Sequence, residues 1–422
     1  MEASLSPLKS SALALPNFDR LIRWCLFLYI FSLPFKALFF IERNGFLVLL
    51  VLLGLWCILN RGHFIVQTPI DIPLVSFVLW ILVTIPFAAY PLYSLQEFGK
   101  LLKQVLIFYA TIYFIRDRTS VIQLVWMFIG VSLVVGLYGL MRYEMNNPQT
   151  MTSFLPSEVW LTTYLVLLIP LSSALAWYEE GPWAKGVYVF NALLAGCCLF
   201  LAQSRAGLLA CFVELWIFAL LVKRQSMLIA ASIISGVTLV AAIFSVTVVT
   251  LPDGSWHLES QTSIRLKLDT RSIVHRLDIW SFMLPRIAEH PVVGIGYGKE
   301  TSKMLFGQVP EENIPPGHAA VRTHGTHNIL FELALHVGLP GAFLFMWLAV
   351  RLGKTVLAGF LQATDVFAKS VLLGVSVGLC GMAVRIMFDQ MLVGTLAVQF
   401  WVFVAIAMIA AGSFRISVAQ QA

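Results

Sequence analysis

A short stretch of the chain, THGTHNILFELALHVGLPG at residues 323–341, contains the residue types that proton transfer requires. An imidazole with a pKa of about 6.5 is the natural general base near neutral pH, so His324, His327 and His336 are all candidates. No HExxH spacing and no nearby set of cysteines or carboxylates accompanies them, and we predict no metal site. For His327 the residues alone leave two interpretations open, a catalytic base or a histidine hydrogen-bonded at a helix N-terminus.

Basic residues form the second group of candidates. Arg205, in LAQSRAGLLA, lies in a tight turn between two long apolar runs with no acid nearby in the sequence, and a charge in such a place indicates a function. The others lie at the ends of apolar runs: Lys100, Lys103, Arg142 and Arg385. Together these cations could hold a polyanion such as a lipid-linked pyrophosphate, because Arg pairs with phosphate oxygens through two hydrogen bonds. Alternatively, Lys100 and Lys103 could extend to lipid headgroups, and Arg385 could pair with Asp389.

Membrane helices must position these residues. The chain has 422 residues, of which 59% are hydrophobic and only 12% charged. Its apolar runs are continuous and exceed the roughly 18–20 residues that cross a bilayer, where every backbone amide must be paired internally. We therefore predict an all-α polytopic membrane protein with about twelve transmembrane helices. They lie near 21–41, 44–60, 70–89, 98–115, 121–142, 158–178, 183–203, 206–222, 227–250, 326–350, 366–388 and 391–412.

Lys and Arg in the short loops predict the orientation, because cytoplasmic loops carry the excess of both. This rule places both termini in the cytoplasm. Residues 1–250 then hold helices one to nine, 251–325 form one large external loop, and 326–422 hold helices ten to twelve and a short cytoplasmic tail. The candidate histidines and cations named above lie on the external side in this arrangement. The net charge of +6 is explained by loop placement, and no nucleic acid is expected as a partner.

The large loop contains two further patterns. RSIVHRLDIWSFMLPRIAEH at 271–290 repeats apolar residues at helical spacing, namely Ile273, Leu277, Trp280, Leu284 and Ile287. This predicts an amphipathic helix that lies on the membrane surface or covers the helix bundle. HPVVGIGYG at 290–298 is rich in glycine but lacks the strand-then-helix context of a dinucleotide site, so we interpret it as a flexible turn.

Three stretches together resemble one family. They are QSRAGLLA (203–210), HRLDIW…IAEHPVVGIGYG (275–298) and THNILFELALHVGLPG (326–341). In order and spacing they resemble the bacterial O-antigen ligase / O-antigen polymerase superfamily over about 203–390. The resemblance implies a metal-independent, cofactor-free glycosyltransferase of the GT-C type in the inner membrane. Its active site would face the periplasm, and its donor would be a glycan on undecaprenyl pyrophosphate.

The resemblance also assigns roles to residues. Arg205 matches the arginine of the first motif, Arg276 the loop arginine four residues before Trp280, and His327 the histidine of the His-Asn motif. It implies that His327 deprotonates an acceptor hydroxyl, while Arg205 and Arg276 stabilise charge on the departing pyrophosphate. The remaining cations would bind phosphate groups around this centre: Arg265, Lys100, Lys103, Arg142 and Arg385.

Which member of the superfamily this is stays open at this stage. A length near 420 residues favours a ligase that joins O-antigen to lipid A–core, with membrane lipids around it. An O-antigen polymerase is the alternative within the superfamily, and a transporter or flippase is the alternative outside it. The sequence has no Walker A lysine motif and no DxD pair, so neither ATP nor a metal-bound sugar nucleotide is expected as a substrate.

Overall fold

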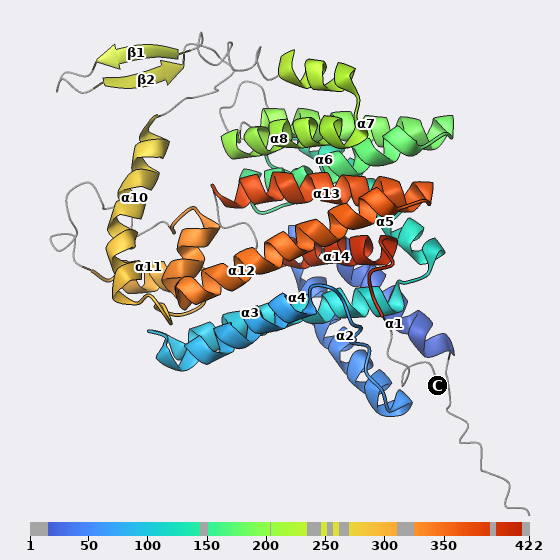
Figure 1. The fold of residues 1–422 in the computed structure, drawn as a ribbon, viewed down its shortest axis with the longest axis horizontal. Helices are drawn as coiled ribbons and strands as arrows, with labels where there is room; N and C mark the ends of the chain where they lie inside the picture. Colours follow the sequence, from blue (N-terminus) through green and yellow to red (C-terminus); the bar gives the residue numbers. More distant parts are fainter. Residues whose placement is uncertain are drawn as a thin grey trace, which may run out of the picture.

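Long apolar helices make up the protein (Figure 1). The computed structural model describes residues 16–143, 151–202, 204–233, 246–250, 256–260, 270–309, 325–388 and 394–415. The elements are α1 (Pro16–Ser32), η1 (Lys36–Leu38), α2 (Phe39–Asn60), α3 (Asp71–Thr84), η2 (Ile85–Phe87), α4 (Pro91–Phe114), α5 (Arg118–Met141), α6 (Glu158–Tyr178), α7 (Pro182–Leu201), α8 (Arg205–Val222), β1 (Val246–Thr250), β2 (Trp256–Ser260), α10 (Thr270–Glu289), α11 (Thr301–Phe306), α12 (Ile329–Gln362), α13 (Val366–Ile386) and α14 (Gly394–Ala410).

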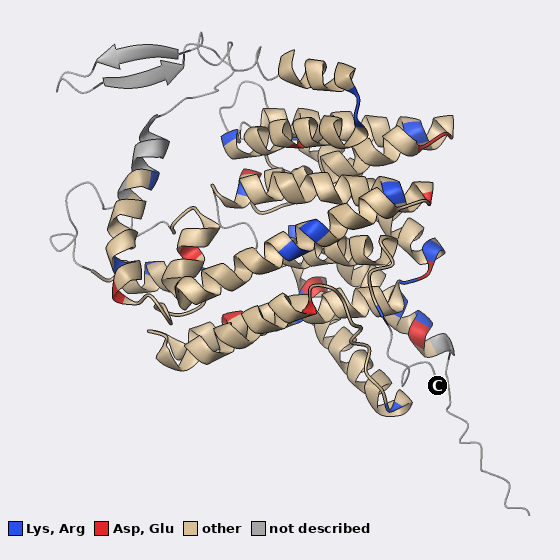
Figure 2. Cartoon of the chain, in the orientation of Figure 1, with Lys and Arg blue, Asp and Glu red and all other residues tan. Residues whose placement is uncertain are grey.

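Within these residues, 7 helical segments are long and apolar enough to cross a membrane, and two shorter apolar ones accompany them at Asp71–Phe87 and Gly394–Ala410. Long uncharged stretches of ribbon separate the charged residues (Figure 2), as a hydrocarbon environment requires. The chain is therefore a polytopic helical membrane protein. The figure of twelve spans and the sidedness stay predictions.

Short polar side chains begin many of these helices by accepting a hydrogen bond from a backbone amide in the first turn. The side chains that do so belong to Asp117, Ser157, Ser204, Asn328 and Asp365. Because these caps stand at the borders of apolar runs, the predicted bounds of α5, α6 and α8 agree with the observed bounds within a few residues.

The centre of the bundle is formed by α6 and α13. Of the most apolar part of α6, 83% is buried inside the protein, whereas the value for the segment containing α2 is 11%. Gly374 of α13 allows the two helices to approach closely, since a Cβ there would lie 2.6 Å from the Leu171 Cα. Small residues serve this purpose in membranes, where close backbone packing replaces the hydrophobic effect between helices.

Two helix predictions near the ends of the chain need correction. The first predicted span, 21–41, is divided, because α1 ends at Ser32 and α2 begins at Phe39. Pro34 lies between them and has no amide hydrogen to continue a helix. The tenth predicted span, 326–350, is in fact a longer helix that ends at Gln362 and is broken near its start. Non-helical backbone at Val337 and Gly338 causes this break.

The glycine-rich segment 290–298 docks against the break in α12, so its interpretation as a flexible turn was wrong. Each of the three carbonyl groups at the break accepts a hydrogen bond of 2.8–2.9 Å: Leu335 from the Ile295 amide, His336 from the Gly296 amide and Val337 from the Trp80 indole. Backbone groups at membrane depth need such partners. The glycines are required because the two backbones touch, and a Cβ at Gly294 would lie 2.4 Å from the His336 carbonyl carbon.

The large loop contains the predicted helix, as α10, and it packs on the bundle at the start of α12 (Figure 1). Its buried face was predicted only in part. Leu277 and Leu284 are 53% and 51% exposed, and the buried residues are Ile279, Phe282, Met283 and Ile287. The helix carries apolar residues on more than one side, and the contact with α11 and α12 decides which side is covered.

The all-α prediction also missed a hairpin. Residues 246–250, which we expected at the end of the ninth span, form β1, and β1 pairs antiparallel with β2. The reason is local, since the VTVVT sequence of β1 consists entirely of β-branched residues, which favour an extended backbone.

Candidate functional site

His327 lies in a tight turn immediately before α12. Its φ of +51° is in the left-handed region, which is uncommon for a residue other than glycine. Asn328 caps α12, because its Oδ1 accepts from the Leu330 and Phe331 amides at 2.9 and 3.2 Å. The Asn328 Nδ2 donates to the Met387 carbonyl at 3.1 Å, which ties the turn to the end of α13. The half-buried His327 is thus both a residue of a helix-start turn and a candidate base.

Arg276 reaches the same end of α13 from α10. Its guanidinium carbon lies 5.9 Å from the centre of the Phe388 ring. Trp280, one turn further along, donates from Nε1 to the Thr326 carbonyl at 2.8 Å and stacks on Phe331. The loop helix and the His327 turn are therefore fixed to each other, and the structure brings together two of the three residues that were predicted to be catalytic.

Arg205 is the exposed first residue of α8. The turn that holds it is capped by Ser204, whose Oγ accepts from the Gly207 amide at 3.2 Å. Gly207 packs against the start of α6, since a Cβ there would lie 3.3 Å from the Thr162 Cβ. Trp160, in the same first turns of α6, lines the polar cavity described next.

A polar cavity of about 460 Å³ lies between five helices and the glycine-rich segment. It is lined by the starts of α2, α6, α12 and α14 and by the first half of α4. Its charged lining residues are Glu42, Arg43, Glu97, Lys100, Lys103, Lys299 and Glu332, and His336 also lines it. Lys103 pairs with Glu42 at 2.6 Å, and Lys100 pairs with Glu97. The two predicted lysines thus face a cavity and contact carboxylates within the protein. Among the described residues, Arg205, Arg276 and His327 do not line this cavity.

The other predicted cations have separate places. Arg385 is 2% exposed and lies in the last turn of α13, near the Asn328 contact. Arg142 is exposed, with its guanidinium carbon 5.8 Å from the centre of the Tyr138 ring, and it does not line the polar cavity. Arg265 and Asp389 lie outside the described residues, as does His324.

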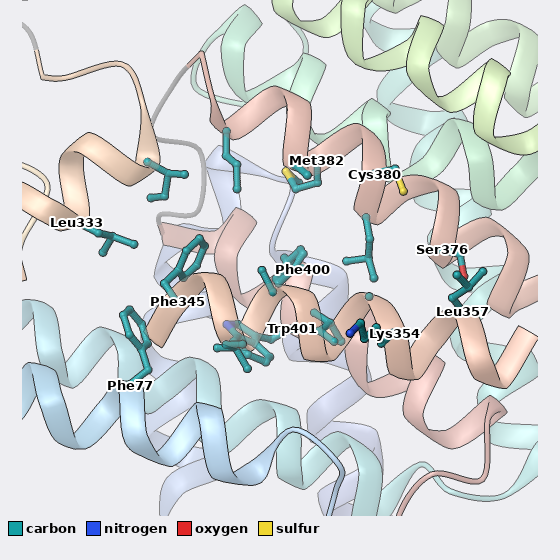
Figure 3. A pocket seen from close by; sticks show the side chains of 18 of the residues that line it. Phe77, Leu333, Phe345, Lys354, Leu357, Ser376, Cys380, Met382, Phe400 and Trp401 are labelled. Atoms are coloured by element: carbon teal, nitrogen blue, oxygen red, sulfur yellow. The ribbon is translucent and has the colours of Figure 1, made fainter. Parts of the chain in front are cut away.

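An apolar cavity of about 560 Å³, drawn in Figure 3, adjoins the polar one through shared lining residues. Phe77, Phe345 and Trp401 line it, and near its other end stand Lys354 and Leu357. The two cavities share four wall residues: Gln104, Tyr297, Ile329 and Leu333. A long apolar chain in one cavity would therefore end beside the charged groups of the other.

Tyr297, which lines the polar cavity, and Tyr93, whose ring lies beside the lining residue Gly298, both remain protonated at neutral pH. Burial, followed by the neighbouring Glu97 carboxylate, raises the pKa of Tyr297 well above its usual range. Burial is also the main reason that the pKa of Tyr93 rises to about 12, although the hydrogen bond from the Glu300 amide opposes the rise. Their hydroxyl groups can accordingly donate hydrogen bonds to bound anions or sugars.

Sequence reasoning missed several residues of the cavity. Glu42 is 61 positions from Lys103, and such a separation gives no local signal. Glu97 stands three residues before Lys100 on one helix, so that pair could have been found from spacing. His336, in contrast, was named among the candidate histidines; it is 2% exposed, with Nε2 at 2.9 Å from the Ser302 Oγ. In the described part of the chain, no group of three or more His, Cys, Asp or Glu side chains could hold a metal ion.

Part of the chain matches a known protein family. Residues 190–346 match the family model described as O-antigen ligase. The matched region includes Arg205, Arg276 and His327, and it extends from α7 through the break in α12. No curated protein matches the chain.

Proposed function

We propose that this membrane protein is an O-antigen ligase, because residues 190–346 match the family model of that description. It transfers a glycan from undecaprenyl pyrophosphate to a hydroxyl of a lipid A–core sugar. The reaction takes place on the periplasmic face of the inner membrane, and both termini lie in the cytoplasm. Neither a metal ion nor a cofactor takes part.

The observation that carries this proposal is the pair of joined cavities. A polyprenyl-linked donor has a long apolar chain and a charged head, and it needs an apolar space beside a polar one. The apolar cavity of about 560 Å³ and the polar cavity of about 460 Å³ share a wall, which supports a substrate of this kind. A soluble sugar nucleotide has no use for the apolar cavity.

The reaction balances with the residues of the matched region. His327 takes the proton of the acceptor hydroxyl, and the acceptor oxygen attacks the anomeric carbon of the glycan. The bond from that carbon to the pyrophosphate oxygen breaks, and undecaprenyl pyrophosphate leaves with the bonding electrons. Arg205 and Arg276 stabilise the negative charge that builds on it. A single displacement of this type inverts the anomeric centre, so we place this protein among inverting GT-C glycosyltransferases.

The other cations bind phosphate groups in this proposal. Lys100 and Lys103 serve the polar cavity, where an incoming phosphate competes with their carboxylate partners. Arg385 supports the His327 end of the site from α13. Arg265 and Arg142 are assigned by the same chemistry, and the position of Arg142 beside Tyr138 gives this assignment the least support.

Reconstitution decides between the candidate functions. The purified protein is placed in liposomes with undecaprenyl-pyrophosphate glycan and lipid A–core, with a chelator and without ATP. A ligase produces glycan-capped lipid A–core. If only longer lipid-linked glycan forms, the protein is a polymerase, and if glycan only crosses the bilayer, it is a transporter.

The role of His327 is tested in the same system. Replacement by alanine should abolish transfer while the donor still binds, because the arginines and the apolar cavity are intact. His290→Ala is the matched control, since His290 is an exposed histidine at the first position of the glycine-rich segment, directly after α10. Turnover of His327→Ala close to that of His290→Ala would reject the assignment of His327 as the base.

A further inference from the structure

We propose that Glu332 is a positioning residue that holds the 326–328 turn, and with it His327, in the conformation used for transfer. The inference rests on the proposed function of His327. Glu332 lies in the first turns of α12 and is 5% exposed. It was not among the residues that the sequence pointed to, and the family match does not assign it a role.

The backbone of His327 has an unusual conformation that its surroundings must hold. A residue other than glycine at φ +51° is in a sparsely populated conformation, and such a conformation persists only where the surroundings determine it. The surroundings here are polar contacts of the two neighbouring residues. Asn328 is held through its cap and its bond to the Met387 carbonyl. Thr326 is held on the other side, and its carbonyl accepts from Trp280.

The side chain of Thr326 is held by Glu332. Its hydroxyl is fully buried and lies 2.8 Å from Oε2 of Glu332 and 3.0 Å from the Asn328 carbonyl. A carboxylate accepts a hydroxyl hydrogen more strongly than a carbonyl does, so the hydroxyl donates to Glu332. The Thr326 oxygen is then oriented toward the Asn328 amide, 3.5 Å away. Glu332 therefore determines the geometry on both sides of His327.

The other oxygen of the Glu332 carboxylate faces His336. Oε1 of Glu332 lies 3.4 Å from Nδ1 of His336, and Nε2 of His336 lies 2.9 Å from the Ser302 Oγ. This Ser–His–Glu order matches that of a hydrolase triad, but Ser302 is 0% exposed and cannot reach a substrate. The chain of contacts instead connects α11 to the His327 turn through one carboxylate, which is the geometry of a support.

Four variants test the proposal against Glu300→Ala as the control, since the partly exposed Glu300 side chain lies in the same loop and pairs with Lys299 and Lys303. Glu332→Ala and Thr326→Val should each lower kcat by about 100-fold with KM little changed, because small displacements of a catalytic group have effects of this size. Glu332→Gln should retain most activity, because its amide oxygen accepts the same hydrogen bond. The double variant Glu332→Ala/Thr326→Val should have a kcat no lower than that of Glu332→Ala, since the two substitutions remove the same hydrogen bond.

Hydrogen–deuterium exchange of the peptide covering 325–333 gives a readout that needs no activity. Exchange should rise in Glu332→Ala and stay at the wild-type level in Glu332→Gln and in the control. If Glu332→Gln is as inactive as Glu332→Ala, the carboxylate handles a proton itself and the positioning role is wrong. Unchanged exchange in Glu332→Ala would also overturn it. If the wild-type protein transfers no glycan, the proposed function fails, and exchange alone decides whether Glu332 holds the turn.

Discussion

Replacing Gly338 with alanine should destabilise the protein by preventing the glycine-rich segment from docking at the break in α12. Gly338 has φ +75° and ψ 173°, a region that is essentially restricted to glycine. A Cβ there would lie only 1.9 Å from the Val292 carbonyl oxygen, and both groups belong to backbones that cannot rotate away.

The magnitude follows from two contributions. Forcing alanine into this backbone conformation costs about 1–3 kcal/mol. Moving the segment away also breaks backbone hydrogen bonds such as that from the Leu339 amide to the Pro291 carbonyl, each of which contributes about 1 kcal/mol. The expected loss is therefore roughly 2–5 kcal/mol of the free energy of unfolding.

Gly353, also in α12, supplies a matched control for which the expected change in the free energy of unfolding has the opposite sign. Apart from the neighbouring backbone of its own helix, no atom lies within 4 Å of the position that a Cβ would occupy at Gly353. Alanine there should stabilise the helix by about 0.5–1 kcal/mol, because it restricts the unfolded backbone without meeting a neighbour.

Thermal unfolding in one detergent, followed by intrinsic fluorescence, compares the two variants. Gly338→Ala should unfold at a clearly lower temperature than the wild-type protein, and Gly353→Ala at an equal or higher one. Hydrogen exchange of the 290–298 peptide should rise in Gly338→Ala alone. If both variants unfold together and the peptide stays protected, the docked arrangement of the segment is wrong.

Three further predictions concern the site and its support. Arg205→Ala and Arg276→Ala should each lower kcat about 10²–10³-fold in the liposome assay, as expected when one donor to a developing anion is removed, and a loss of only a few-fold would contradict that role. Gly381→Ala should lower the free energy of unfolding by roughly 1–3 kcal/mol, and with it the unfolding temperature, because its Cβ would lie 1.8 Å from the buried Glu214 Oε1. An unchanged unfolding temperature would mean that α13 and α8 are not in close contact at this point. Lys103→Gln should weaken binding of the donor, measured by titration in detergent, more than Lys100→Gln, because the Lys103 side chain is 20% exposed and that of Lys100 is 56% exposed.

The helices could be predicted from the sequence wherever a local rule determines them. The length of an apolar run fixes a membrane helix, and a polar residue at its border fixes the start, as Ser157 does for α6 and Asp365 for α13. The break in α12 has a local signal in Gly338 and Pro340. Its partner, the segment 290–298, could not be predicted, because hydrogen bonds between residues about forty positions apart leave no periodic pattern.

The candidate site was predictable in its residue types and less so in its arrangement. Arg205 stands out because a cation beside an apolar run is costly, whereas Arg276 was singled out only by the resemblance of its motif. The acids of the polar cavity do not stand out in this way. Glu42 becomes part of the site only through its 2.6 Å contact with Lys103, which depends on how α2 packs against α4. The sequence therefore indicated the charge of the cations and left their neutralising partners unpredicted.

The surroundings of His327 and His336 differ in a way that bears on which of them could act as the base. A general base needs a ring nitrogen within hydrogen-bond reach of the substrate proton. The ring of His336 is 2% exposed, and its two nitrogens already lie 2.9 Å from the Ser302 hydroxyl and 3.4 Å from the Glu332 carboxylate. Using it as a base would require that buried chain of contacts to open. His327 is only half-buried and stands in the turn before α12, so an acceptor can reach it more easily than the buried His336. This difference supports His327 as the base and His336 as part of the frame that holds it.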